Sequence, residues 1–209
     1  SGGCGGCGNA SERRGETRRY HDRDESSVLG LGRARDRPAC RRSAARQGRE
    51  RADHRAVPAV HSNGVAGALV GGELGEMLDA AGLTACAGPP TSYVLTFSNG
   101  LVVYLSGDTG ITAEQESVVR GHYGAKLVVM NIGDTFTTGP KEAAYVVNQL
   151  IKPSAVIASH VNEAATEEGK VVPNTKTDTF IEASSVPVHL PLSGRTMDFD
   201  RDGNCVSGC

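Results

Sequence analysis

The sequence lacks the long apolar segments that mark membrane and secreted proteins. It contains no run near the ~18 apolar residues that suggest a membrane-spanning helix, so we expect no membrane association. It also shows no basic stretch followed by an apolar one, which is the pattern of a secretory signal peptide. Without either feature, a cytoplasmic location is slightly favoured, and the compartment itself stays open.

Residues 1–55 lack lysine, isoleucine, phenylalanine and methionine. Their composition cannot bury enough apolar surface to offset chain entropy, so we expect this segment to be disordered. Residues 1–56 carry 14 arginines against 8 acidic residues, a net charge of +6, whereas the remainder carries 8 basic and 16 acidic residues, a net of −8. The segment is interpreted as an arginine-rich arm for nucleic acid, a passive disordered leader, or coding sequence in a shifted frame. We favour the shifted frame, and nucleic acid is the less favoured partner.

Cysteine is scarce and scattered, with 6 residues in 209. That number and spacing are not those of a disulfide scaffold or a clear zinc ribbon. Cys4-x-x-Cys7 and Cys205-x-x-x-Cys209 have spacings compatible with a four-thiolate zinc site or with a pair of disulfides. We expect unpaired thiols instead, and the redox compartment is left undecided.

What the sequence does contain is three short apolar runs that each end at a residue able to bind a metal. Residues 56–60 precede His61, residues 101–106 precede Gly107-Asp108, and residues 155–159 precede His160. Runs of this length, rich in valine and bounded by glycine or proline, predict buried strands. Because a strand end fixes the side chain that follows it at the sheet edge, these three residues are candidate ligands.

Other segments predict a mixed α/β domain over residues 56–209. Asn99-Gly100 lies between two strand-like runs and predicts a hairpin with a type I′ turn. Helical spacing is found in residues 73–81 and 113–123, and Gly139-Pro140 is typical of a helix start. Residues 162–178 are polar and are predicted to form a loop. Further strands are expected at 127–132, 186–190 and 195–199.

Histidine and carboxylate ligands at strand ends suit Zn²⁺ or a similar first-row ion. Each motif alone also fits a hydrogen-bonded turn, and Gly107-Asp108-Thr109-Gly110 could be an Asx-type turn. The three motifs together favour a metal site. Such a site lowers the pKa of bound water to about 7 and makes hydroxide available as a nucleophile.

Residues 56–209 resemble the later part of a metallo-β-lactamase-fold hydrolase, in the branch near the ascorbate-phosphate lactonases. The motifs that carry the resemblance are VHSNG at 60–64, YLSGDTG at 104–110, NIGD at 131–134, TGPKEAA at 138–144 and SHVNE at 159–163. The resemblance implies an α/β fold, an αββα sandwich whose first half is incomplete or disordered here. It also implies one or two ions, Zn²⁺ or alternatively Mn²⁺ or Fe²⁺, at one edge of the sheets.

The resemblance also implies roles for individual residues. By position His61 matches the middle histidine ligand, Asp108 the catalytic carboxylate that bridges two metals, and His160 the last histidine ligand. Asn162 and Glu163 follow closely enough to contact the ligands or the substrate. The implied reaction uses a metal-bound hydroxide on an ester, lactone or phosphate ester of a small-molecule substrate, and self-association is left open.

One departure from the family pattern is large. The family has a His-x-His-x-Asp-His motif well before its middle histidine, and this sequence has none. Its absence leaves too few ligands for tight metal binding. It also leaves the apolar faces of residues 93–160 partly uncovered. We therefore expect weak or no activity, and the alternative interpretation is a non-catalytic protein that keeps the fold without metal chemistry.

Overall fold

The computed structural model describes residues 52–209, and the predictions for residues 1–51 lie outside the described part. The first strand, β1 (Ala52–Pro58), pairs with β4 (Thr91–Phe97) along its whole length. Residues 52–55, which the sequence analysis assigned to the core-poor segment, therefore belong to the sheet. Backbone pairing with β4 holds them, because five of the six residues from Ala52 to Val57 are exposed and only Val57 is buried.

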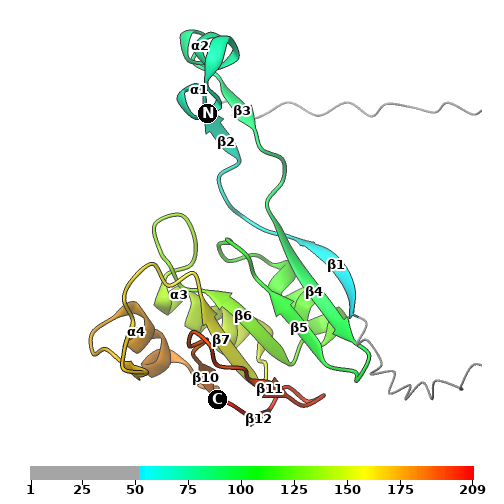
Figure 1. The fold of residues 1–209 in the computed structure, drawn as a ribbon. Coiled ribbons are helices and arrows are strands. Elements are labelled where there is room, and N and C mark those ends of the chain that lie inside the picture. The colour runs from blue at the N-terminus through cyan, green and yellow to red at the C-terminus, as the bar shows by residue number, and fades with distance from the viewer. Residues whose placement is uncertain (1–51) are drawn as a thin grey trace, which may run out of the picture. The chain divides into compact units, whose positions relative to one another are not determined.

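A six-stranded sheet carries the described part of the chain, in the order β1-β4-β5-β6-β7-β10 (Figure 1). Strands β1, β4 and β5 pair antiparallel, whereas β5, β6, β7 and β10 pair parallel. The strands predicted on either side of Asn99-Gly100 and at 127–132, 155–159 and 186–190 are all found. Their observed bounds are β4 as above, β5 (Val102–Leu105), β6 (Leu127–Asn131), β7 (Ala155–Ser159) and β10 (Val188–His189).

The β4–β5 hairpin is confirmed, but its predicted turn type is wrong. Gly100 has a φ of 93°, whereas Asn99 is not among the residues with positive φ, as a type I′ turn would require. Instead, the Asn99 side-chain oxygen accepts a hydrogen bond from the backbone N–H of Leu101 (2.9 Å). That local bond offers asparagine an alternative to the left-handed conformation.

The predicted helices are found, and the structure adds α4 (Lys176–Ala183) here and the short α1 (Gly67–Val70) described below. Residues 113–123 contain the π-helical segment η1 (Gln115–Tyr123), and α3 (Pro140–Tyr145) begins at Gly139-Pro140 and continues as the π-helical η2 (Val146–Ile151). The predicted loop 162–178 instead contains the two-stranded β8 (Thr166–Glu167) and β9 (Lys170–Val171) and the start of α4 (Lys176–Ala183). Helix α4 is N-capped by Thr175, whose side chain accepts from the N–H of Asp178.

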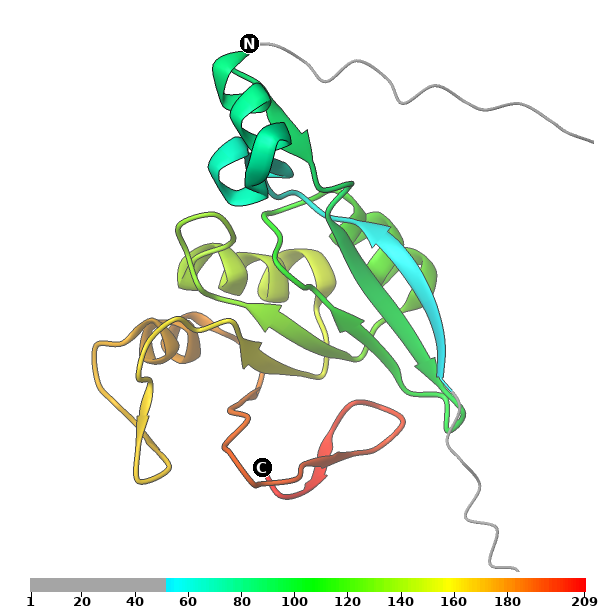
Figure 2. The same ribbon diagram turned by 45° about the horizontal axis from the view of Figure 1, so that its top comes forward.

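The main core lies between the sheet and these helices. Apolar side chains of β4 to β7 pack against those of η1, α3, η2 and α4, with Phe180 of α4 fully buried. Figure 2 shows the helices on one side of the sheet and the C-terminal hairpin on the other. That hairpin consists of β11 (Asp198–Phe199) and β12 (Cys205–Ser207).

The opposite face of the sheet is only partly covered. A smaller buried cluster, formed by Leu101, Val103, Leu127 and Ala155, contacts Phe199 of the hairpin. Neighbouring apolar side chains on this face stay half-buried: Leu95, Leu105, Val129 and Ile157. The described residues thus confirm the mixed α/β class, with one large sheet, helices on one face and a partly covered second face, as expected for an incomplete sandwich.

An excursion between β1 and β4 contains β2 (Gly64–Ala66), α1 (Gly67–Val70), α2 (Gly72–Ala80) and β3 (Thr84–Cys86). Helix α2 confirms the helix predicted at 73–81. Its apolar side chains are not buried, however, since Leu74 is 60% and Met77 63% exposed. None of the helices in residues 52–209 is long and apolar enough to cross a membrane.

The expectation of unpaired thiols is wrong for the C-terminal pair, because Cys205 and Cys209 form a disulfide. The hairpin turns the chain so that their Cα atoms are 6.4 Å apart, which is within the range of disulfides. Cys86 is a free, exposed thiol as expected. Cys4, Cys7 and Cys40 lie outside the described residues.

Candidate metal centre

Asp108 and His160 meet at one edge of the sheet. They follow β5 and β7, which run parallel on either side of β6, so their carboxyl ends lie at the same edge. The Asp108 Oδ2 and His160 Nε2 atoms are 3.3 Å apart, and their side chains are 48% and 37% exposed. Of the three residues predicted at strand ends, Asp108 and His160 thus lie together.

The backbone at this edge adopts conformations that are uncommon for residues with side chains. His160 has a φ of 47° and Asn162 a φ of 56°, and Asp134 and Thr135, after β6, have φ values of 65° and 66°. Non-glycine residues seldom adopt positive φ, and such positions cluster at functional sites. The concentration after two adjacent strands points to this edge as the functional one.

Asn131, the last residue of β6, holds the loop that carries Asp108. Its buried amide Nδ2 donates to the carbonyl of Thr109 (3.0 Å) and to the hydroxyl of Thr138 (2.9 Å). The Thr138 hydroxyl donates back to the Asn131 carbonyl (2.8 Å), and the Ser106 hydroxyl accepts from the Asn131 N–H (3.0 Å). This buried network fixes the residues on both sides of Asp108.

Thr109 extends the network toward His61. Its hydroxyl accepts from the N–H of Val60 (3.0 Å) and donates to the Gly110 carbonyl (3.1 Å), while the Gly110 N–H donates to the Val60 carbonyl (2.8 Å). Val60 directly precedes His61. The segments carrying Asp108 and His61 are thus held together by hydrogen bonds, although they are far apart in sequence.

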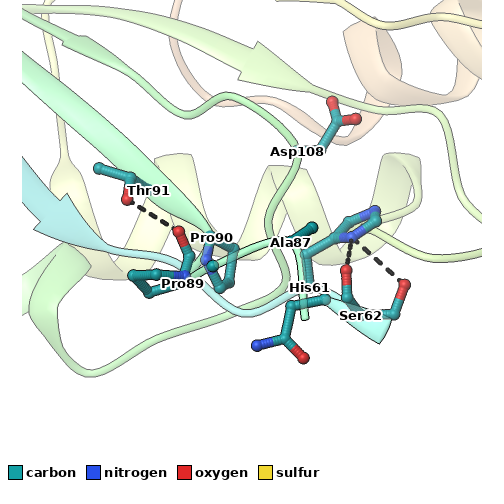
Figure 3. A pocket seen from close by; sticks show the side chains of 9 residues that line it. His61, Ser62, Ala87, Pro89, Pro90, Thr91 and Asp108 are labelled. Atoms are coloured by element: carbon teal, nitrogen blue, oxygen red, sulfur yellow. Dashed lines mark hydrogen bonds between the residues drawn. The ribbon is translucent and has the colours of Figure 1, made fainter. Parts of the chain in front are cut away.

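His61 lines a cavity of about 320 Å³ together with Asp108 (Figure 3). The other lining residues are Ser62, Asn63, Ala87, Gly88, Pro89, Pro90 and Thr91. The His61 Nδ1 atom lies 2.8 Å from the Ser62 carbonyl oxygen, which accepts a hydrogen bond only if Nδ1 carries the proton. That tautomer leaves Nε2 with a free lone pair, as a metal ligand requires.

Only two of the three predicted ligands lie close together. In Figure 3 the carboxylate of Asp108 points away from the imidazole of His61. Within residues 52–209, three or more potential ligand atoms lie within 4.8 Å of one another only in a different cluster, formed by His189, Cys205 and Cys209. Asp108 and His160 therefore form a pair, and His61 stands at the neighbouring cavity wall.

Asn162 and Glu163 lie close to the site but have structural contacts of their own. The Glu163 carboxylate accepts from the N–H of Thr177 (3.1 Å) in the first turn of α4, where a negative charge is favoured. The Asn162 amide packs against Gly133, where an added Cβ atom would lie 2.8 Å from it. Lys176 donates from Nζ to the Gly133 carbonyl (2.7 Å), which joins α4 to the same edge.

The Asp108–His160 pair fits two adjacent ligands of one metal ion. Two donor atoms about 2.0–2.2 Å from a tetrahedral ion lie about 3.3–3.6 Å apart, and the observed separation falls in this range. A carboxylate oxygen and an imidazole nitrogen are also the donors that zinc and related ions accept. The same pair with no ion would form a hydrogen bond or an ion pair.

Sequence reasoning missed the residues that support the site. Asn131 and Thr138 are polar groups buried in apolar surroundings, and such groups require internal hydrogen-bond partners. The signal that could have identified them is a lone asparagine at the end of an apolar strand. Thr175, followed three residues later by Asp178, was likewise a recognisable helix start.

Comparisons with known proteins find relatives over about half of the chain. No family model matches the chain. A UPF0173 metal-dependent hydrolase of Polynucleobacter asymbioticus is 30% identical over 113 residues, which are 54% of this chain and 38% of that protein. The same description belongs to a Methanosarcina barkeri protein, 35% identical over 50% of this chain and 46% of its own length. The predicted resemblance to metal-dependent hydrolases is thus confirmed, and the chain spans less than half the length of these relatives.

Among solved structures, a metallo hydrolase from Ignicoccus hospitalis is 22% identical and has a TM-score of 0.44. The match covers 74% of this chain and 52% of that one. A metallo-β-lactamase fold protein from Bacillus subtilis is 11% identical with a TM-score of 0.39, and the match covers 51% of this chain and 43% of that one.

Proposed function

We propose that this chain supplies part of the active site of a metal-dependent hydrolase. The observation that carries the proposal is the 3.3 Å separation between Asp108 Oδ2 and His160 Nε2 at the shared edge of β5 and β7. Similarity to metal-dependent hydrolases over half of the chain supports it.

In this proposal Asp108 and His160 hold the ion, and His61 contributes a third donor through Nε2. Zn²⁺ suits these donors, and Mn²⁺ or Fe²⁺ are alternatives. When bound, the ion acts as a Lewis acid and lowers the pKa of water to about 7. In the tautomer that carries the proton on Nδ1, His61 donates to the Ser62 carbonyl and its Nε2 atom is free to bind metal.

The cavity beside Asp108 is the proposed substrate site. Its wall offers the hydroxyl of Ser62 and the amide of Asn63, and includes no lysine or arginine. A small ester, lactone or phosphate ester fits a cavity of about 320 Å³. Hydrogen bonds from the hydroxyl and the amide would orient the scissile group toward Asp108. Asn162, at the adjacent strand end, is a further candidate for substrate contact.

We expect the activity of this chain to be weak, because the His-x-His-x-Asp-His motif is absent. Only Asp108 and His160 lie together, and the third donor, His61, stands apart from them, whereas catalytic zinc sites bring three protein ligands onto one ion. A second candidate function, a non-catalytic protein of the same fold, is favoured by one observation. His61 stands apart from the Asp108–His160 pair, which can persist as a simple ion pair.

The test is the metal content of the purified full chain, measured by elemental analysis beside an Asp108→Ala variant. We expect the variant to lose metal by at least about tenfold, since even an outer partner of a ligand contributes 10–100-fold to affinity. Asp53→Ala is the matched control, because Asp53 is an exposed carboxylate paired with Arg55 on β1.

The two candidate functions give opposite results. Metal that Asp108→Ala loses and Asp53→Ala retains supports the hydrolase, and screening against esters, lactones and phosphate esters then follows. Equal metal content in wild type and Asp108→Ala would contradict the proposed centre and favour the non-catalytic protein.

A further inference from the structure

The C-terminal hairpin brings two cysteines beside a histidine of the main sheet. Cys205 begins β12, Cys209 follows it, and His189 belongs to β10, the outermost strand next to β7. Phe199 of β11 packs edge-on against the His189 ring, with centroids 5.5 Å apart. This contact holds the hairpin against β10, so the two cysteines are fixed near the imidazole.

The arrangement has the composition and spacing of a metal site. The Sγ atoms of Cys205 and Cys209 and one ring nitrogen of His189 all lie within 4.8 Å of one another. Two thiolates and an imidazole form a ligand set that zinc accepts, with a fourth position left for water.

The chain here can exist in two forms. In the structure the two sulfurs are joined in a disulfide and cannot both act as thiolate ligands. Cys209 is exposed, so a thiol reductant can reach the bond. Gly208, between Ser207 and Cys209, has a φ of 78°, a conformation that lets the chain turn back toward Cys205 without strain.

We propose that His189, Cys205 and Cys209 form a redox-switched zinc site, separate from the Asp108–His160 pair and sharing no residue with it. A dithiol reductant gives two electrons and two protons to the Cys205–Cys209 bond and is itself oxidised to a disulfide. Zn²⁺ then displaces the two thiol protons and binds both sulfurs and the imidazole. In the reverse direction a small-molecule disulfide takes two electrons from the two zinc-bound thiolates and, with two protons, becomes two thiols, while the Cys205–Cys209 bond re-forms and the ion is released.

The experiment uses the full chain carrying Asp108→Ala, so that the first candidate centre does not contribute. The protein is reduced with a phosphine, freed of reductant without oxygen, and titrated with zinc against a chromophoric chelator. A matched sample is first oxidised to the disulfide. We expect the reduced chain to bind one zinc more than the oxidised chain. Cobalt in place of zinc should give a sulfur-to-cobalt charge-transfer band only after reduction.

Variants identify the ligands. Cys209→Ser, which changes an exposed side chain, should abolish the extra zinc and the charge-transfer band while the fold is kept. His189→Ala should keep the thiols but lower the zinc affinity. The loss should be at least about 10–100-fold, which is the effect of removing a residue that only supports a ligand. Cys86→Ser is the matched thiol control and should change neither. A Cys4→Ser, Cys7→Ser double variant tests the other cysteine pair and should also retain the site.

Three results would overturn the proposal. One is equal zinc binding by the reduced and oxidised chains. Another is unchanged affinity in both His189→Ala and Cys209→Ser. The third is loss of the zinc in the Cys4→Ser, Cys7→Ser variant alone. Because Asp108 is absent from every sample, these results are independent of the proposed hydrolase.

Discussion

At the scale of single residues, the candidate centre depends on buried polar groups that bind no ligand themselves. Asn131 bridges the Asp108 loop and the Thr138 loop through a single amide. A buried amide whose partners are also buried cannot be replaced by an apolar group without leaving those partners unpaired. The position of Asp108 is therefore decided partly at the end of the neighbouring strand.

Asn131→Ala should destabilise the chain by about 1–3 kcal/mol, because the Thr109 carbonyl loses a buried donor. Denaturant unfolding measures this cost, and metal content should fall in parallel as the Asp108 loop loosens. Gln149→Ala removes an exposed amide on η2 and should change neither quantity. Full stability in Asn131→Ala would show that the network does not hold the loop.

Tyr104 predicts a pH dependence at the alkaline end. Burial raises the pKa of Tyr104, whose hydroxyl donates to Ser92 (3.1 Å). Above about pH 10 the unfolded chain releases this proton while the folded chain keeps it, so the stabilising contribution falls as pH rises through that range. Urea unfolding between pH 8 and 11 should show a steeper loss in wild type than in Tyr104→Phe.

Tyr145→Phe is the control for this series, because Tyr145 is 49% exposed. It should follow the wild-type pH profile. Tyr104→Phe should itself cost about 0.5–1.5 kcal/mol at neutral pH through the lost hydrogen bond. Parallel profiles for wild type and Tyr104→Phe would show that another group controls alkaline unfolding.

At the scale of elements, α4 connects the core to the site. Phe180 packs into the core, Lys176 donates to the Gly133 carbonyl, and the N–H of Thr177 is held by Glu163 beside His160. The helix therefore supports the strand ends that carry the candidate ligands, although it provides none of them.

Thr175→Ala removes the N-cap of α4 and should cost about 1 kcal/mol of stability. Thr175→Ser keeps a hydroxyl at the cap and should recover most of that loss. Thermal unfolding followed by circular dichroism compares the three chains, with the exposed Thr166→Ala as a neutral change. If Thr175→Ala and Thr166→Ala unfold alike, the cap contributes nothing.

At the scale of the whole described part, stability is concentrated on one face of the sheet. The helices bury one face, whereas the other is covered only in part by the β11–β12 hairpin. Exposed apolar side chains gather instead in the α1–α2 excursion, with Leu69, Leu74 and Met77 all more than half exposed. Truncating a side chain should therefore lower the free energy of unfolding strongly on the helical face of the sheet and only slightly elsewhere.

Phe180→Ala should cost about 3–5 kcal/mol, since the side chain is fully buried between α4 and the sheet. Phe136→Ala is the matched control, because Phe136 is 71% exposed in the loop after β6. It should leave the free energy of unfolding nearly unchanged. Similar losses for the two variants, measured by urea unfolding, would show that packing between α4 and the sheet does not set the stability.

The sequence by itself determined the strands and the residues that follow them. Alternating turns and valine-rich runs located β4 to β7, because a strand buried on both faces requires a continuous apolar run. The same runs placed Asp108 and His160 at strand ends, and parallel pairing then brought them together. Two predictions were wrong, the type I′ turn at Asn99 and the loop at 162–178. Local side-chain hydrogen bonds, at Asn99 and at Thr175, decided the backbone conformation there.

Only the tertiary structure decided which groups meet across the chain. The bond from Asn131 to Thr109, the bond from Val60 (next to His61) to Thr109, and the cluster of His189 with Cys205 and Cys209 all join segments distant in sequence. No local pattern encodes such contacts, because they depend on how strands pair and how the C-terminal hairpin packs on the sheet. The sequence thus pointed to His61, Asp108 and His160 as candidate ligands, and the fold decided that Asp108 and His160 lie within reach of each other.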